Sequence, residues 1–127
     1  MSAYCSYQLL IEVARPVRCR IGRLRTFTFP VGRYVYSGSA KRAFEARIAR
    51  HLRARKTRRW HIDYLLRAAG VTVVGVVRAR RDECSLNRAV AGRAVAPGFG
   101  ASDCTAGCGA HLKRLDHRQA SQRGGAR

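Results

Sequence analysis

Residues 32–44 read GRYVYSGSAKRAF, a stretch in which the pattern of apolar residues changes halfway. Tyr34 and Tyr36 are separated by one residue, so a β-strand here carries both tyrosines on one face. The strand pattern ends at Gly38, where the missing side chain lets a backbone or a phosphate approach closely. From Lys41 onward the apolar residues recur at helical spacing. The stretch therefore predicts a strand that runs directly into a helix.

Short strand patterns lie on both sides of this stretch. Alternating apolar residues predict early strands at residues 7–13, 18–21, 24–29 and 32–37. The most apolar run, at residues 71–77, predicts a buried strand. Because the early strands follow one another so closely, we expect them to form an antiparallel meander.

Helical patterns are found in three segments, residues 41–55, 61–69 and 82–94. In the first segment, Phe44, Ile48 and Leu52 form an apolar stripe. Gly70 is suited to end the second segment. Strands and helices together predict an α+β fold, in which a small antiparallel β-sheet is flanked by helices.

The length and composition predict one domain followed by a tail. A chain of 127 residues has the size of a single domain, and 46% hydrophobic residues can supply a core. We expect the domain to cover residues 1–112, with a short last strand at residues 110–112. Residues 113–127 have no apolar period and are expected to form a disordered basic tail.

The chain is strongly basic, with 26 Lys and Arg residues against 7 Asp and Glu residues and a formal charge of +19. Such a field attracts polyanions and steers them toward the protein. Nucleic acid is the leading partner, and an anionic membrane surface is the second. Most of the basic residues are arginine, and a compositional bias of the genome would also raise the arginine content without any functional demand.

The sequence shows no pattern typical of export or of a membrane span. No run approaches the roughly 18 apolar residues that a membrane span needs. Glu12 interrupts the first apolar stretch, and no basic segment precedes it. We therefore expect a cytoplasmic protein that has no membrane partner. Five cysteines, an odd number, then indicate free thiols or a metal site in place of a disulfide framework.

The first predicted helix carries its basic residues in two places. On a helical wheel, Arg42, Arg50 and Arg53 lie opposite the apolar stripe, on the solvated side. Arg47 and His51 lie one turn apart at the edge of the stripe. An arginine that packing holds there can stabilise the charge of a transition state. The alternative is that Arg47 snorkels and His51 is an ordinary boundary residue.

The order and spacing of several short stretches resemble the GIY-YIG nuclease family, and more closely its small stand-alone branch, described as Uri-superfamily endonucleases. These stretches are CSYQLLIEV, YVYSGSA, RIARHLR, WHIDYLL, DEC and GFGASDC, within residues 4–112. In this resemblance, Tyr7 matches the tyrosine of the first motif and Tyr36 that of the second. Arg47 matches the arginine of the helix, and His51 the position where relatives carry His or Tyr. Glu83 matches the metal-binding glutamate.

The resemblance implies a metal-dependent endonuclease that hydrolyses phosphodiester bonds, with DNA favoured over RNA. Glu83 would hold Mg²⁺ or Mn²⁺, and Arg47 would stabilise charge on the phosphate. Tyr7 would act as the general base on the attacking water, while Tyr36 and His51 would position the phosphate or relay a proton. Because a free tyrosine has a pKa near 10, the cation and Arg47 would have to lower the pKa of Tyr7.

Five further residues are candidates for contact with the nucleic acid: Gly38, Lys41, Arg58, Arg59 and His61. The basic residues suit phosphate contacts, which position a nucleic acid without reading its sequence. Structure-specific or nonspecific cutting is therefore expected. Two alternatives stay open, a catalytically degenerate member of the same fold that only binds nucleic acid, and a basic accessory protein of ribonucleoprotein particles.

A cysteine-rich segment near the end has ligands of the type that bind zinc. The candidates are Asp103, Cys104, Cys108 and His111, with Cys84, His61 or His117 as a further ligand. Residues 105–107 separate the two cysteines more widely than is usual in the branch that the chain resembles. We therefore expect ordinary thiols here and no structural zinc. The sequence makes no prediction about the oligomeric state.

Overall fold

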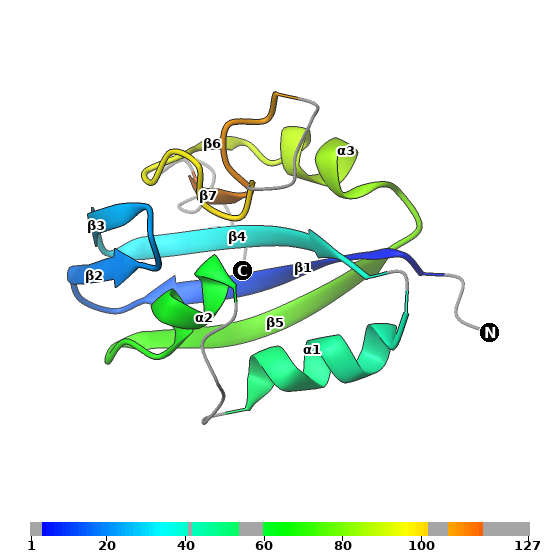
Figure 1. Cartoon of the computed structure of the whole chain (residues 1–127), viewed down its shortest axis with the longest axis horizontal. Coiled ribbons are helices and arrows are strands. Elements are labelled where there is room, and N and C mark those ends of the chain that lie inside the picture. Colours follow the sequence, from blue (N-terminus) through cyan, green and yellow to red (C-terminus); the bar gives the residue numbers. More distant parts are fainter. Residues whose placement is uncertain (1–3, 41, 54–59, 102–106, 116–127) are drawn as a thin grey trace, which may run out of the picture.

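The computed structural model describes residues 4–40, 42–53, 60–101 and 107–115 of the chain, and it confirms the α+β fold (Figure 1). The strands are β1 (Ser6–Val13), β2 (Val17–Ile21), β3 (Arg25–Phe29), β4 (Gly32–Ser39), β5 (Val71–Ala79), β6 (Gly92–Arg93) and β7 (Leu112–Leu115). The helices are α1 (Phe44–Leu52), α2 (His61–Leu66) and α3 (Glu83–Arg88).

The strands form two antiparallel sheets. The five-stranded sheet has the order β5-β1-β4-β7-β6, and β2 and β3 pair in a separate two-stranded sheet. Because β2 and β3 pair only with each other, β1 lies directly beside β4, with Leu9 opposite Tyr36. The expected meander of consecutive strands is therefore wrong, although the antiparallel direction is confirmed.

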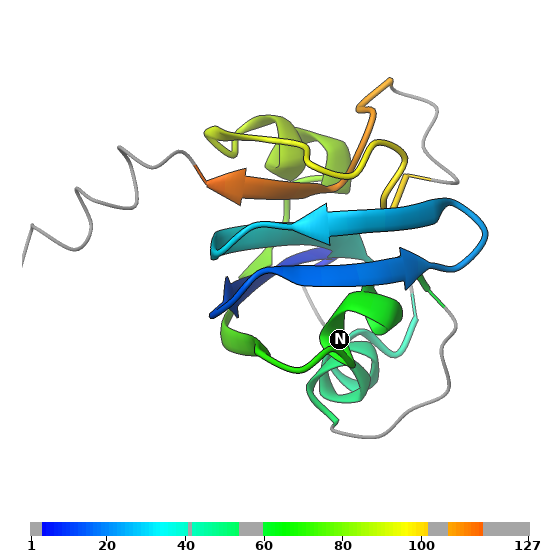
Figure 2. The ribbon, with the colours of Figure 1, turned by 90° about the vertical axis from the view of Figure 1, so that its left-hand side faces the viewer.

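The core lies against one face of β1 and β4. Successive residues of a strand point to opposite faces, so Tyr7, Leu9 and Ile11 share a face and are buried together. They pack in one cluster with apolar residues of α1, α2 and the β2–β3 hairpin. In Figure 2 the green helices α1 and α2 lie below the strands, and the yellow-green α3 lies above them. The first strand therefore runs through the middle of the molecule.

Strand β5 differs from its prediction because it lies at the edge of the sheet. Val74 and Val77 are 48% and 42% exposed, so the expected buried strand is wrong. Val73 and Val76 pack against the core from the other face of the strand. An apolar run of this length cannot distinguish an edge strand from a central one, because burial depends on which strands pair beside it.

The folded part extends beyond the predicted boundary at residue 112. Lys113 and Arg114 lie within β7, and Leu115 is buried. The Lys113 ammonium donates to the backbone oxygen of Asn87, and the Arg114 guanidinium donates to that of Val31. Basic side chains at these positions bond backbone carbonyls and so do not interrupt the strand. Residues 116–127 of the predicted tail lie outside the described residues.

Helix α3 ends at Arg88, earlier than the predicted residue 94. Asp82 begins it as expected, since its carboxylate accepts a hydrogen bond from the Ser85 backbone N–H. None of the helices in the described part of the chain has the length and apolar character needed to cross a membrane.

Candidate active site

Tyr7 and His51 form a buried hydrogen bond at the centre of the molecule. The Tyr7 hydroxyl lies 2.7 Å from Nε2 of His51, and both side chains are buried. The helical wheel places His51 at the edge of the apolar stripe, but the structure buries it, while Leu52 is 52% exposed. The buried face of α1 is thus rotated away from Leu52, because the Tyr7 ring provides the surface against which the helix packs.

Gly38 makes room for Tyr7. The two residues lie opposite each other across β1 and β4, and a Cβ atom at Gly38 would lie 2.6 Å from the Tyr7 ring and hydroxyl. The space above this glycine is therefore filled from within the protein. The glycine is needed here for Tyr7, and an approach of a nucleic-acid backbone to Gly38 stays a prediction.

The two tyrosines of β4 differ in their surroundings. The Tyr36 ring packs edge-on against His51, with 6.2 Å between the ring centroids. The Tyr34 hydroxyl instead donates to the backbone oxygen of Pro30, at 2.7 Å, and its ring packs against Phe29. Tyr36 therefore belongs to the Tyr7–His51 cluster, whereas Tyr34 stabilises the hairpin end of the core.

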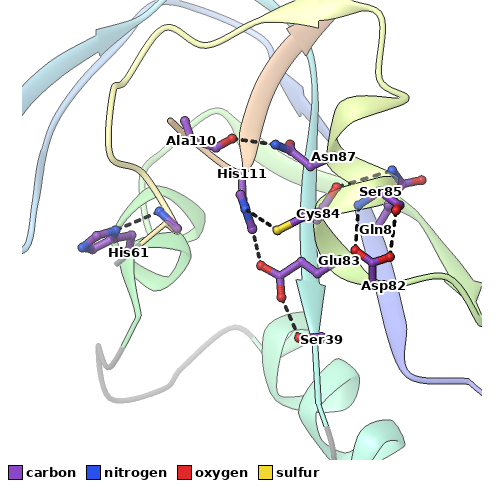
Figure 3. Close-up of polar contacts among 12 residues, drawn as sticks. Gln8, Ser39, His61, Asp82, Glu83, Cys84, Ser85, Asn87, Ala110 and His111 are labelled. Carbon is purple, nitrogen blue, oxygen red and sulfur yellow. Dashed lines mark hydrogen bonds and ion pairs between the residues drawn. The ribbon is translucent and has the colours of Figure 1, made fainter. Parts of the chain in front are cut away.

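Ser39, the last residue of β4, joins Arg47 to Glu83. The Arg47 guanidinium donates to the Ser39 backbone oxygen at 2.9 Å, and the Ser39 hydroxyl donates to the Glu83 carboxylate at 2.6 Å. The other carboxylate oxygen of Glu83 pairs with Nδ1 of His111 (Figure 3). The structure thus brings a cation from α1 and a carboxylate from α3 to the same serine. Sequence reasoning missed Ser39, although its place directly after Gly38 was a usable signal.

The Trp60 ring also contacts the Arg47 guanidinium, by a cation–π interaction. The guanidinium carbon of Arg47 lies 4.6 Å from the Trp60 ring centroid, and that of Arg50 lies 4.5 Å from it. Trp60 also packs against His51, at 5.8 Å between centroids, and against the core. Stacking of this kind restrains an arginine that would otherwise be mobile. The Trp60 side chain therefore packs against the core, and this packing orients Arg47.

Arg50 and Asp63 form an ion pair that sequence reasoning did not predict. The Arg50 guanidinium donates to the Asp63 carboxylate at 3.0 Å, and Asp63 is fully buried. Asp63 also accepts from the Trp60 backbone N–H at 2.9 Å. The wheel places Arg50 on the solvated side, but its side chain is only 16% exposed, because it pairs with Asp63 of α2. The pair positions Trp60 and thereby the stacked Arg47.

A comparison with protein-family models finds a match over residues 6–124, to the family described as "Domain of unknown function DUF123". The chain belongs to the DUF123 family. No curated protein and no solved structure matches the chain. The description of the family names no activity, so the chemistry of this DUF123 protein has to be inferred from its residues.

The protonation of the cluster follows from burial and from hydrogen bonds. Burial raises the pKa of Tyr7 well above its ordinary value, although the nearby Arg47 guanidinium acts in the opposite direction. Burial likewise raises the pKa of Tyr36. Burial also opposes ionisation of Glu83, but the hydrogen bonds from His111 and Ser39 outweigh it and lower the pKa of that carboxyl. At neutral pH this DUF123 domain therefore holds two protonated tyrosines beside an ionised Glu83. Arg47 alone does not produce the lowered tyrosine pKa that the resemblance requires.

The expected nucleic-acid contacts are described only in part. Lys41, Arg58 and Arg59 lie outside the described residues of the DUF123 domain. Nδ1 of His61 accepts a hydrogen bond from the Gly100 backbone N–H at 2.9 Å, and burial lowers the pKa of His61. His61 thus connects α2 to the loop that follows β6, away from Glu83 (Figure 3).

Proposed function

We propose that this DUF123 protein is a metal-dependent endonuclease that hydrolyses phosphodiester bonds, with DNA as the first substrate to test. The proposal rests on one observation above all: Arg47 and Glu83 meet at Ser39, close to the Tyr7–His51 hydrogen bond. The resemblance to the GIY-YIG nucleases assigns functions to these same residues. Their convergence from β1, α1 and α3 supports that assignment.

The positive charge of Arg47 and the negative charge of Glu83, which both bond Ser39, suit the hydrolysis of a phosphodiester. The guanidinium of Arg47, restrained by Trp60 and Ser39, can bind a phosphate oxygen and stabilise the charge that develops there. Because these partners already hold Arg47, little reorganisation is needed when the charge develops. Glu83 supplies the opposite charge, which suits a cation and not the phosphate itself.

Glu83 fits a divalent cation such as Mg²⁺ or Mn²⁺. Its carboxyl is held ionised, and its side chain is 24% exposed, so that water can reach it. Magnesium is often held by one or two carboxylates together with water and substrate phosphate. When bound, the ion would supply positive charge against the scissile phosphate and the leaving oxygen. Each oxygen of Glu83 accepts one hydrogen bond and keeps lone-pair capacity for such a ligand.

Tyr7 and His51 suit proton transfer as a pair. A buried tyrosine with a raised pKa is a weak base alone, so its proton needs an acceptor within reach. Nε2 of His51, at 2.7 Å, is such an acceptor. We assign Tyr7 the activation of the attacking water, with His51 taking the tyrosine proton. Tyr36 packs against His51 and orients its ring.

The charge of +19 favours a polyanionic substrate and supports the nucleic-acid assignment. Phosphate contacts alone carry no sequence information, so we assign structure-specific or nonspecific cutting. The competing function is a degenerate member of the fold that only binds nucleic acid. Such a protein would need the charge but neither Tyr7 nor Glu83.

A cleavage assay tests the proposal. Labelled single-stranded, duplex and branched DNA, with an RNA strand beside them, are incubated at low salt with Mg²⁺, Mn²⁺ or EDTA. We expect cutting of at least one DNA only with metal, and a loss of about 10²-fold or more in Glu83→Gln. Glu45→Gln is the matched control, because Glu45 lies on the surface of α1 and pairs with Arg78. If the wild-type protein binds these nucleic acids but cuts none of them with either metal, the degenerate binding protein is the correct function.

A further inference from the structure

Three metal-ligating side chains outside the proposed catalytic cluster meet beside it. The Sγ atoms of Cys84 and Cys108 and a ring nitrogen of His111 all lie within 4.8 Å of one another. Cys84 comes from α3, while Cys108 and His111 both lie just before β7. The wide spacing between Cys104 and Cys108 argues against zinc, but it concerns only the cysteine-rich segment near the end of the chain. Folding adds Cys84 from a segment more than twenty residues earlier in the chain.

His111 is oriented as a metal ligand. Its Nδ1 pairs with the Glu83 carboxylate, which leaves Nε2 directed toward Cys84 Sγ, at 3.9 Å (Figure 3). A metal-bound histidine usually donates its other ring N–H to a carboxylate or a carbonyl in this way. The His111 backbone is also fixed on both sides, since its N–H donates to Phe99 and its carbonyl accepts from Ser37. The imidazole is buried and therefore has little freedom to turn away.

The separation of Cys84 and His111 is close to that of two ligands in a small tetrahedral centre. Zinc binds cysteine sulfur at about 2.3 Å and histidine nitrogen at about 2.0–2.1 Å, which puts sulfur and nitrogen ligands about 3.6 Å apart. Cys84 Sγ and His111 Nε2 lie 3.9 Å apart before any ion draws them together. Gly107 and Gly109, on either side of Cys108, have φ angles of 75° and 80°, which favour glycine and shape the turn that presents the thiol.

We propose that Cys84, Cys108 and His111 bind a zinc-class divalent cation, with water or an external ligand in the fourth position. Two thiolates and an imidazole select zinc over magnesium, which prefers oxygen ligands. On binding, the two thiols lose their protons to solvent and the neutral imidazole contributes Nε2. This centre is separate from the magnesium position at Glu83 and does not depend on nuclease activity. Glu83, the proposed magnesium ligand, also pairs with His111, a ligand of the zinc-class ion. Binding of the zinc-class ion would therefore fix the carboxylate that serves the catalytic cluster.

Cysteine labelling of the wild-type full chain tests the proposal without any variant. The reduced protein is treated with N-ethylmaleimide, with and without Zn²⁺, and the modified cysteines are mapped by mass spectrometry. We expect Zn²⁺ to protect Cys84 and Cys108 and to leave the exposed Cys5 reactive. Equal labelling of Cys84 and Cys108 with and without Zn²⁺ would overturn the proposal. Protection of both thiols in the absence of zinc would show that burial and not the ion shields them, and would overturn it too.

Cobalt binding by variants then identifies the ligands. Co²⁺ alone is titrated into the metal-free protein, and the sulfur-to-cobalt charge-transfer absorption is recorded. One equivalent should bind to wild type and to Cys19→Ser, a matched control whose thiol bonds the Tyr64 backbone oxygen. The absorption should be lost in Cys84→Ser and Cys108→Ser, and Glu83→Ala should weaken binding by about 10–100-fold. Unchanged absorption in both serine variants would contradict the assignment. Because no nucleic acid is present, this result is independent of whether the protein cuts DNA.

Discussion

The contact between Tyr7 and Gly38 explains at the residue scale why the strand of residues 32–39 ends in a glycine. The glycine lies opposite Tyr7 and accommodates its ring, and this places the hydroxyl against His51. The glycine at the end of this strand thus accommodates Tyr7, the side chain to which we assign a catalytic role. The sequence correctly marks Gly38 as a point of close approach, and the group that approaches it in the structure is the Tyr7 ring.

Substitution of Gly38 tests this contact. In Gly38→Ala the new Cβ would lie 2.6 Å from the Tyr7 ring, so the ring has to move. We expect a loss of about 1–3 kcal/mol in the free energy of unfolding, as for other overpacked sites, together with reduced cleavage. Gly75→Ala is the matched strand control, because the nearest atom to its Cβ would belong to the flexible Leu10 side chain, at 3.1 Å. Urea unfolding measures both variants. A Gly38→Ala variant no less stable than Gly75→Ala would contradict the account.

At the scale of elements, two ion pairs of α1 are expected to differ in importance. Arg50 pairs with the fully buried Asp63 of α2, whereas Glu45 pairs with Arg78 of β5 at the surface. Removal of a buried partner leaves a charge uncompensated and commonly costs about 3–5 kcal/mol. We therefore expect Asp63→Ala to destabilise the protein strongly and Glu45→Ala to change its stability little, as judged by thermal unfolding. Equal losses of stability in Asp63→Ala and Glu45→Ala would contradict the greater importance of the buried pair.

The bond between His61 and Gly100 predicts a dependence of stability on pH. Burial lowers the pKa of His61 in the folded protein below its usual 6.5, and Nδ1 must stay unprotonated to accept from Gly100. On acidification below 6.5 the unfolded chain therefore binds the proton first, and this contribution to stability is lost. Asparagine can accept the same bond without titrating. Urea unfolding at pH 7.5 and 5 should show a smaller loss for His61→Asn than for wild type. Identical losses would exclude His61 as the titrating group.

Helices and strands with a regular spacing of apolar residues could be predicted from the sequence, but the contacts between these elements could not. The alternation in β1 and β4 and the stripe of α1 suffice to place Tyr7, Tyr36 and Arg47 on strands and helix. The link through Ser39, the Arg50–Asp63 pair and the approach of Cys84 to His111 depend on how distant segments pack. The exposure of β5 depends on its place in the sheet, which its apolar residues do not encode.

For the whole molecule, the charge of +19 predicts an affinity for nucleic acid that depends strongly on salt. If about 6–10 phosphates are contacted, affinity should fall by about 10³–10⁵-fold between 50 and 200 mM salt. Fluorescence anisotropy with a labelled duplex measures this. Deletion of residues 116–127 is the appropriate control for the tail, because β7 runs to Leu115. A collapse of affinity in the deleted protein would favour the accessory-protein alternative, and affinity independent of salt would contradict phosphate binding.

We propose that the Tyr7 cluster cuts nucleic acid that the basic surface attracts. The most direct measurement is single-turnover cleavage of the best DNA substrate with Mg²⁺, alongside affinity for the same DNA, in wild type, Tyr7→Phe and Tyr34→Phe. Tyr34 lies on the same face of the sheet but bonds only Pro30 through its hydroxyl, so it is a matched control. We expect Tyr7→Phe to lose about 10²–10⁴-fold in rate with its affinity unchanged, while Tyr34→Phe cuts like wild type. Equal rates in the two variants, or a wild-type protein that binds this DNA without cutting it, would contradict the claim.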